Sequence, residues 1–246
     1  MSNKAEFIVV GCGDAFGSGG QLNTCFFIRS ASGGLLIDCG ATSLSGLRRQ
    51  GVSPDDIDVI VITHFHGDHF AGLPFLLLDL AVKGRTRPLV IISPPGCKGR
   101  LEVLLSILYP SSAVLEKLNL EFREFIWGSV VTTGFAGVEA LPVIHTPESL
   151  PHGVKIFFDR LVVAYSGDTE WTENLILLSE NADLFICECC FFSSEVKGHL
   201  NYQQIFDRRS SLRCKKLLLT HFDQEMLIHK DVIALEYAED GKRLWI

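Results

Sequence analysis

The stretch Thr63-His64-Phe65-His66-Gly67-Asp68-His69 follows directly on the apolar run Val59-Ile60-Val61-Ile62. The apolar run is typical of a buried strand, and it delivers three histidines and an aspartate into one short loop. His64 and His66 are two positions apart, so an extended backbone points both rings to the same side. Gly67 then allows a sharp turn that brings Asp68 and His69 back toward the same space.

Histidine and carboxylate side chains gathered in one place can bind metal ions. Two imidazoles can hold one divalent metal, and a carboxylate with an imidazole can begin a second site beside it. A polar loop with surface histidines is the alternative interpretation. The density of the cluster, three histidines within six residues, favours the metal site.

The composition describes a globular protein rather than a fibrous, disordered or membrane protein. Of the 246 residues, 47% are apolar and 21% are charged, which predicts a sizeable core and a single domain over residues 1–246. The N-terminus has no signal-peptide pattern, and eight scattered cysteines fit reduced thiols, so we expect a cytoplasmic location. The apolar runs are too short to span a bilayer. A net charge of −7 argues against broad nonspecific nucleic-acid binding.

Apolar periodicity and turn residues predict strands and helices in both halves of the chain. The expected strands cover residues 7–10, 21–29, 34–38, 57–63, 89–93, 154–158, 161–165, 182–188 and 217–220, with short strand-like runs over 122–143. The expected helices cover residues 42–50, 70–83, 100–109, 171–178 and 202–212. No linker or charge block divides the chain, so the pattern predicts an α+β domain with two sheets packed face to face and helices outside.

Two loops beside the predicted strands have more than one interpretation. The glycine loop over residues 11–20 has the spacing GxGxxxG and no amphipathic helix after it, which does not match a dinucleotide fingerprint. We expect it to form a flexible wall beside the histidine loop. Asp38, at the end of a strand, could orient a ligand histidine or could cap the helix over 42–50.

Four further polar residues each follow directly on an apolar strand: His145, Asp168, Glu188 and His221. Strand ends at one rim of a sheet commonly supply convergent ligands. Two adjacent metals with three ligands each and one bridging carboxylate need five histidines and two aspartates. His64, His66, Asp68, His69, His145, Asp168 and His221 supply that set.

This order of motifs, HxHxDH followed by a distant His, an Asp in SGDT and a final strand-end His, resembles the metallo-β-lactamase superfamily. It is most similar to the ribonuclease Z-like phosphodiesterase branch, and the resemblance covers the whole chain. The fold it implies is a four-layer αββα sandwich of two mixed β-sheets. It also implies that His64, His66 and His145 hold one metal ion, that Asp68, His69 and His221 hold another, and that Asp168 bridges them.

The resemblance further implies a proton-transfer pair. In that branch a glutamate after a late strand pairs with a histidine in a short loop further along. Glu188 and His199 fall on those positions, although the flanking residues match loosely. The resemblance therefore implies catalytic roles for Asp68, Glu188 and His199, and an alternative for His199 is a residue at the entry of the helix over 202–212.

One departure from the branch bears on the substrate. The tRNA-processing enzymes carry a long Gly/Pro-rich arm between the third and fourth metal motifs, whereas here residues 146–167 contain only a loop and a hairpin. We therefore expect a metal-activated hydroxide to cleave a phosphodiester of a nucleotide or small phosphorylated metabolite. Thioester or lactone hydrolysis is the alternative, and tRNA 3′-end processing is the less favoured one.

The expected cofactors are two divalent ions. Zinc is favoured, with manganese or iron as alternatives, because all three accept His and carboxylate ligands. The expected partner is a small anionic substrate such as a nucleotide, and the resemblance also suggests a homodimer.

Overall fold

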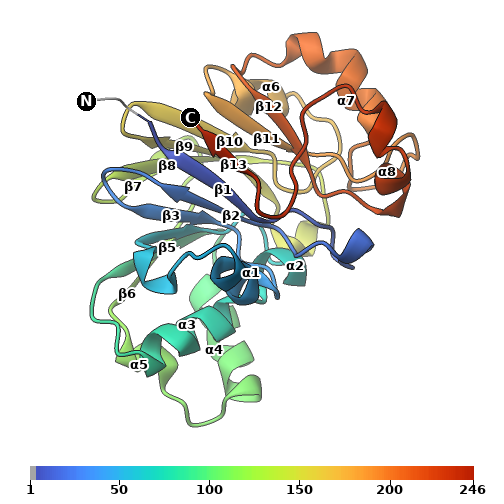
Figure 1. Ribbon diagram of the computed structural model, residues 1–246. Helices are drawn as coiled ribbons and strands as arrows, with labels where there is room; N and C mark the ends of the chain where they lie inside the picture. Colours follow the sequence, from blue (N-terminus) through green and yellow to red (C-terminus); the bar gives the residue numbers. More distant parts are fainter. Residues whose placement is uncertain (1–3) are drawn as a thin grey trace.

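The computed structural model describes residues 4–246, and Figure 1 shows two β-sheets packed face to face with helices on both outer sides. Within those residues the first sheet has seven strands in the order β13-β1-β2-β3-β4-β5-β6. They are β1 (Glu6–Gly11), β2 (Cys25–Arg29), β3 (Gly34–Ile37), β4 (Val59–Val61), β5 (Leu89–Ser93), β6 (Leu120–Glu124) and β13 (Arg243–Trp245).

The second sheet has six strands, again counted over residues 4–246, in the order β12-β11-β10-β9-β8-β7. They are β7 (Val130–Thr132), β8 (Ala136–Pro142), β9 (His152–Phe158), β10 (Leu161–Tyr165), β11 (Leu184–Glu188) and β12 (Leu217–Thr220). Both sheets mix parallel and antiparallel pairs. The predicted αββα sandwich of two mixed sheets is therefore confirmed.

The helices divide between the two outer faces (Figure 1). Covering the first sheet are α1 (Ser43–Arg49), α3 (Leu73–Val82), α4 (Cys97–Leu108) and α5 (Val114–Lys117). Covering the second sheet are α6 (Asn174–Ser179), α7 (Tyr202–Arg208) and α8 (Gln224–Ile228). The short helix α2 (Gly67–Phe70) follows β4 and contains part of the histidine loop.

The period-2 alternation of the strands explains the layers. In β1, Phe7 and Val9 belong to the core between the two sheets, whereas Ile8 and Val10 belong to the core under the helices. Successive side chains of a strand point to opposite faces, so a strand that is apolar at every position must be covered on both sides. The near-continuous apolar runs of the sequence therefore require the four layers.

Strand direction places the polar loops at one rim. Strands β3, β4, β5 and β6 are parallel to each other, and so are β10, β11 and β12. Because β9 is antiparallel to both β8 and β10, β8 runs the same way as β10. The carboxyl ends of these strands carry the polar residues singled out in the sequence, which explains why residues far apart in the chain meet there.

The predicted helix over residues 70–83 is wrong in its boundaries. The helix that forms is α3, which begins only at Leu73, whereas Phe70 ends the preceding short helix α2 and Ala71 and Gly72 lie between the two. Gly72 packs so closely against Gly40 that a Cβ atom there would lie 2.1 Å from the Gly40 carbonyl oxygen. Its N–H donates to the Cys39 carbonyl at 2.8 Å. This close approach ties the histidine loop to the end of β3.

Several short elements were not predicted, because they are only a few residues long. They are α5, α8 and β13, of which β13 pairs antiparallel with β1. Over the part of the chain that the structure describes, no helix has the length and apolar character needed to cross a membrane.

Candidate metal centre

The rim of the sandwich brings the predicted ligands together in two adjoining groups that share Asp168. His64, His66, His145 and Asp168 form one group, in which His66 and His145 are half-buried. Asp68, His69, His221 and Asp168 form the other, in which every member is buried. We call them the open group and the buried group. In each group one donor atom from every residue lies within 4.8 Å of the others.

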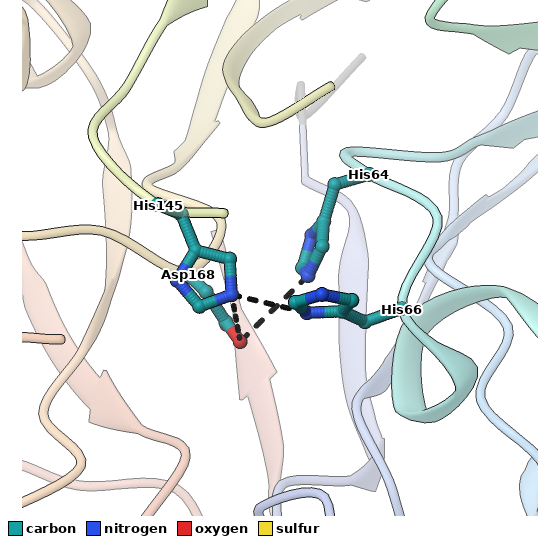
Figure 2. Close-up of side chains that lie close together, drawn as sticks. All are labelled: His64, His66, His145 and Asp168. Carbon is teal, nitrogen blue, oxygen red and sulfur yellow. Dashed lines mark hydrogen bonds and ion pairs between the residues drawn. The ribbon is translucent and has the colours of Figure 1, made fainter. Parts of the chain in front are cut away.

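The open group is assembled from three separate stretches of chain. Figure 2 shows the rings of His64, His66 and His145 turned toward one another and toward the Asp168 carboxylate. The Nδ1 atom of His66 lies 3.0 Å from Nε2 of His145, and Nε2 of His64 lies 3.8 Å from Oδ2 of Asp168. Nitrogen and oxygen lone pairs that converge in this way are suited to one divalent ion.

The buried group is tighter. The Nε2 atom of His69 lies 3.2 Å from Oδ2 of Asp68 and 3.2 Å from Oδ1 of Asp168. The Nε2 atom of His221 lies 3.4 Å from Oδ2 of Asp168. The two oxygens of Asp168 thus face both groups, which is the position that a bridging carboxylate requires.

The ring nitrogens that point away from the centre have partners of their own. Nδ1 of His69 lies 2.6 Å from Asp38 Oδ2, and Nδ1 of His145 lies 2.7 Å from the Gly198 carbonyl oxygen. Nδ1 of His221 lies 3.2 Å from Thr24 Oγ1, and Nδ1 of His64 lies 3.1 Å from Thr63 Oγ1. Such partners hold each ring in one orientation and leave Nε2 facing the centre.

Asp38 therefore orients a histidine and does not cap a helix. Its carboxylate also accepts hydrogen bonds from the N–H and the hydroxyl of Thr63, both at 2.8 Å, whereas α1 begins after Thr42 without a side-chain cap. The roles of Thr24 and Gly198 were not predicted. A threonine hydroxyl or a backbone carbonyl carries no distinctive signal in a sequence, because only the fold determines which imidazole it meets.

Burial and charge act against each other in the centre. Burial lowers the pKa of His64 well below its ordinary value, so that ring is neutral. Burial also opposes ionisation of Asp168, but the imidazoles of His221 and His69 outweigh it and hold the pKa of that carboxyl well below its ordinary value. Conversely, Asp168, Asp68 and Asp38 raise the pKa of His69 well above its ordinary value, in spite of burial.

The residues present fit a pair of divalent ions. Among the described residues, four buried atoms of the centre have no hydrogen-bond partner: His64 Nε2, His69 Nε2, Asp68 Oδ2 and Asp168 Oδ1. Leaving such atoms unpaired is costly, and a cation bound at each group would give them partners. A cation next to His69 would also take the place of the proton that the surrounding carboxylates favour.

Glu188 and His199, which the sequence pairs by resemblance, are in contact. Oε1 of Glu188 lies 3.1 Å from Nδ1 of His199, and the buried carboxylate also accepts the N–H groups of Thr169 at 2.6 Å and Leu200 at 3.2 Å. Burial lowers the pKa of His199, but the Glu188 carboxylate outweighs it and raises that pKa to about 9. The His199 ring centroid lies 4.9 Å from that of His145, so the pair borders the open group.

A cavity of about 510 Å³ lies over the centre. Its lining includes His66, Asp68, His145, Asp168 and His221, together with His199 and four residues of the glycine loop: Asp14, Ala15, Phe16 and Ser18. This volume is in the range of small-molecule sites. The glycine loop thus lies beside the centre, as the sequence predicts, but hydrogen bonds from Phe16 and Ser18 to the Asp14 side chain brace it.

The cysteines near Glu188 are mainly core residues. Cys187 and Cys189 are fully buried within the core of the second sheet. Cys190 is also buried but lines the cavity, and its Sγ lies within 4.8 Å of ring nitrogens of His199 and His221.

Comparison with known proteins gives a family. A family model described as anti-Pycsar protein Apyc1 matches residues 5–242, so the chain belongs to this family. A ribonuclease Z from Clostridium acetobutylicum is 24% identical over 293 aligned positions, which cover 98% of this chain and 93% of that protein.

Two solved structures resemble the whole chain. The metallo-β-lactamase fold protein YhfI from Bacillus subtilis has a TM-score of 0.80 at 23% identity, with 100% of both chains covered. Human tRNase Z, short form, has a TM-score of 0.79 at 22% identity, with 97% of this chain and 98% of that chain covered. The chain thus has the metallo-β-lactamase fold and is related to ribonuclease Z, and it carries a His/Asp candidate metal site.

Proposed function

We propose that this member of the Apyc1 family is a metal-dependent phosphodiesterase whose substrate is a cyclic nucleotide. The observation that carries the proposal is the Glu188–His199 pair beside two donor groups that share one carboxylate. The donor groups would hold two divalent ions, which would supply an acidified water, and a protonated imidazole beside them can serve an alkoxide leaving group.

The size of the site supports a small nucleotide. A cyclic nucleoside monophosphate is the smallest nucleotide that contains a phosphodiester, since both ester oxygens belong to one sugar. A cavity of about 510 Å³ is compatible with such a ligand. Membership of the Apyc1 family also supports this class of substrate.

The donor groups would hold the cofactors as the sequence predicts: His64, His66 and His145 one ion, Asp68, His69 and His221 the other, with Asp168 between them. Two bound divalent ions, for which zinc is favoured and manganese or iron would serve, supply an acidified water and neutralise charge on the phosphoryl oxygens. Asp68, whose Oδ2 faces His69 at 3.2 Å, would orient the attacking water and accept its proton.

His199 would act on the other side of phosphorus. Water adds to phosphorus, one P–O ester bond breaks, and the departing sugar oxygen takes a proton from His199. Because Glu188 binds Nδ1 of this ring, Nε2 is the nitrogen left to carry that proton. The same carboxylate keeps the ring protonated near neutral pH, since it raises the pKa of His199 to about 9.

The relationship to ribonuclease Z makes tRNA processing a second candidate. The structure disfavours it, because residues 146–167 form only a 3₁₀ turn and the β9–β10 hairpin, with no long arm that could clamp a tRNA. The net charge of −7 also gives little general attraction for RNA.

The test is hydrolysis of purine and pyrimidine 3′,5′-cyclic nucleotides by zinc- or manganese-reconstituted protein, with Asp68→Ala as the blank. We expect metal-dependent release of nucleoside monophosphate that the variant loses. His199→Ala should lose about 10²- to 10⁴-fold in kcat on cyclic nucleotides.

A second substrate separates the role of His199 from that of the metal ligands. On bis(p-nitrophenyl) phosphate the loss in His199→Ala should be smaller, because nitrophenolate leaves without a proton. No turnover of any phosphodiester with both metals bound would overturn the proposal and direct attention to thioesters and lactones.

A further inference from the structure

The glycine loop carries an aromatic side chain that the proposed reaction does not use. Phe16 lies between β1 and β2 and is 93% exposed. It nevertheless lines the same cavity as His66, Asp68 and His145. An apolar ring kept in water loses the free energy that burial would bring, and no packing within residues 4–246 recovers it.

The position of the ring is set by the backbone of a braced loop. The Asp14 side chain is buried, and its Oδ1 accepts the N–H groups of Phe16 at 3.1 Å and Ser18 at 2.9 Å. Its Oδ2 accepts the Ser18 hydroxyl at 2.7 Å. Gly17 turns the chain with a φ of 67°, which is readily adopted by glycine. The loop therefore presents the ring rather than leaving it loose.

Another part of the cavity lining belongs to the proposed reaction. It contains His199 and Phe191, whose ring centroids lie 6.1 Å apart, and Phe191 is half-buried. A ligand with its phosphate at the donor groups and its leaving oxygen at His199 would have its remaining part in the same cavity, which Phe16 lines. In a cyclic nucleotide that remaining part is a planar base.

We infer that Phe16 is the stacking platform for the nucleobase of the substrate, a specificity-determining contact that rests on the proposed phosphodiesterase function. Stacking on an aromatic ring is available to every base, because each base has a π face. The platform therefore favours nucleotides over other phosphodiesters without choosing strongly among bases.

Another aromatic near His199 is less suited to this role. Trp171 borders a neighbouring cavity of about 450 Å³ that also reaches His199. Its ring, however, is already covered by the guanidinium of Arg208, whose carbon lies 5.2 Å from the centroid. Trp171 also packs against the core of the second sheet. The face of Phe16 is the one that remains exposed.

The experiment measures binding by calorimetry, so that it does not depend on turnover. Metal-loaded wild type, Phe16→Ala, Phe16→Leu and Phe16→Trp are titrated with AMP, with UMP and with ribose 5-phosphate, which lacks a base. Trp127→Ala is the matched control, because Trp127 is an exposed aromatic (77%) on the β6–β7 turn and is absent from the cavity lining.

In Phe16→Ala the Kd for AMP and UMP should rise at least about fivefold more than the Kd for ribose 5-phosphate, which corresponds to about 1 kcal/mol of stacking. Phe16→Trp should restore the difference, Phe16→Leu should not, and Trp127→Ala should match wild type.

Three results would overturn the inference. An equal loss for all three ligands would make the loop a structural support, and no loss would remove any contact with the base. A change of oligomeric state in Phe16→Ala would assign the ring to an interface between copies. If wild type binds the nucleotides through Phe16 but hydrolyses no cyclic nucleotide, the phosphodiesterase proposal fails and the stacking contact stands.

Discussion

The buried and the open donor groups share Asp168, yet the molecule holds them in different ways. In the buried group, His69 is oriented by the carboxylate of Asp38, which is itself fully buried and bound to Thr63. In the open group, His145 is oriented by the backbone carbonyl of Gly198, next to His199. One group is thus supported by strand ends, and the other partly by a loop at the cavity.

The difference indicates that the two groups would hold their metal ions with different stability and accessibility. A metal in the buried group would be enclosed by carboxylates and imidazoles that cannot move without disturbing the core. A metal in the open group would be the one that exchanges more readily, because His66 and His145 are less completely buried than the members of the other group. Variants that affect one group at a time can test this comparison.

The largest effect is expected where the groups overlap. Asp168→Ala removes the carboxylate that faces both groups, so each would lose a ligand. We expect kcat on the phosphodiester substrate to fall by roughly 10³-fold or more, and zinc content by elemental analysis to fall below that of any single-group variant. Circular dichroism checks that the variant folds. Retention of both metals would show that Asp168 does not bridge them.

Asp38→Asn should weaken the buried group alone. Asp38 has a φ of 56°, which asparagine also tolerates, so the backbone should keep its conformation. The substitution removes the negative charge of the carboxylate that contacts His69. Loss of such a partner typically costs about 10- to 100-fold in metal affinity. Competition with a chromophoric chelator should show one weakened site and one unchanged site. Asp207→Asn, on the exposed part of α7, is the matched control, and equal weakening of both sites would contradict the difference between the groups.

Glu170→Gln should act on the open group. Oε1 of Glu170 accepts the N–H of Gly198 at 2.8 Å, and the carbonyl of Gly198 orients His145. Removing the charge should cost up to about 1.5 kcal/mol, or about tenfold in metal affinity at this group. The same chelator competition should now show the other site weakened. Glu195→Gln serves as the control variant, because Glu195 is an exposed residue of the loop between β11 and α7 that contains Gly198.

The smallest effect is expected from removing the Thr24 hydroxyl, which contacts His221 of the buried group. Thr24→Val keeps the shape of the side chain but removes the partner of His221 Nδ1, which lies 3.2 Å away. One neutral hydrogen bond contributes about 1 kcal/mol, so we expect about fivefold weaker metal binding at the buried group. An effect as large as that of Asp38→Asn would mean that charge is not what distinguishes the two supports.

Metal removal should lower the stability of the whole fold. Chelation leaves buried atoms such as His64 Nε2 and Asp68 Oδ2 without partners among the described residues. The apo protein should therefore melt at a lower temperature than the metal-loaded protein, because ligands that bind only the native state stabilise it. An unchanged melting temperature in calorimetry would argue that the centre holds no metal with useful affinity.

Much of this protein could be predicted from its sequence because the relevant signals are local. Apolar strands identify the elements, and His64, His145, Asp168 and His221 each follow within three residues of a strand end. The alternation of β1 between two cores follows from the same period. Boundaries were less predictable where close packing decides them, as at Gly72, which contacts Gly40 just before the expected helix begins at Leu73.

The sequence by itself thus determined the αββα fold, the family resemblance and the set of residues gathered at the rim. Only the tertiary structure decided that Asp38 orients His69, that Gly198 orients His145, that one donor group is buried and the other half-open, and that Phe16 faces the cavity. The physical reason is that the metal-binding residues can be recognised from their residue types and from their order along the strands. The partners of those ligands are common groups, hydroxyls and backbone carbonyls among them, whose roles come only from the neighbours that folding gives them.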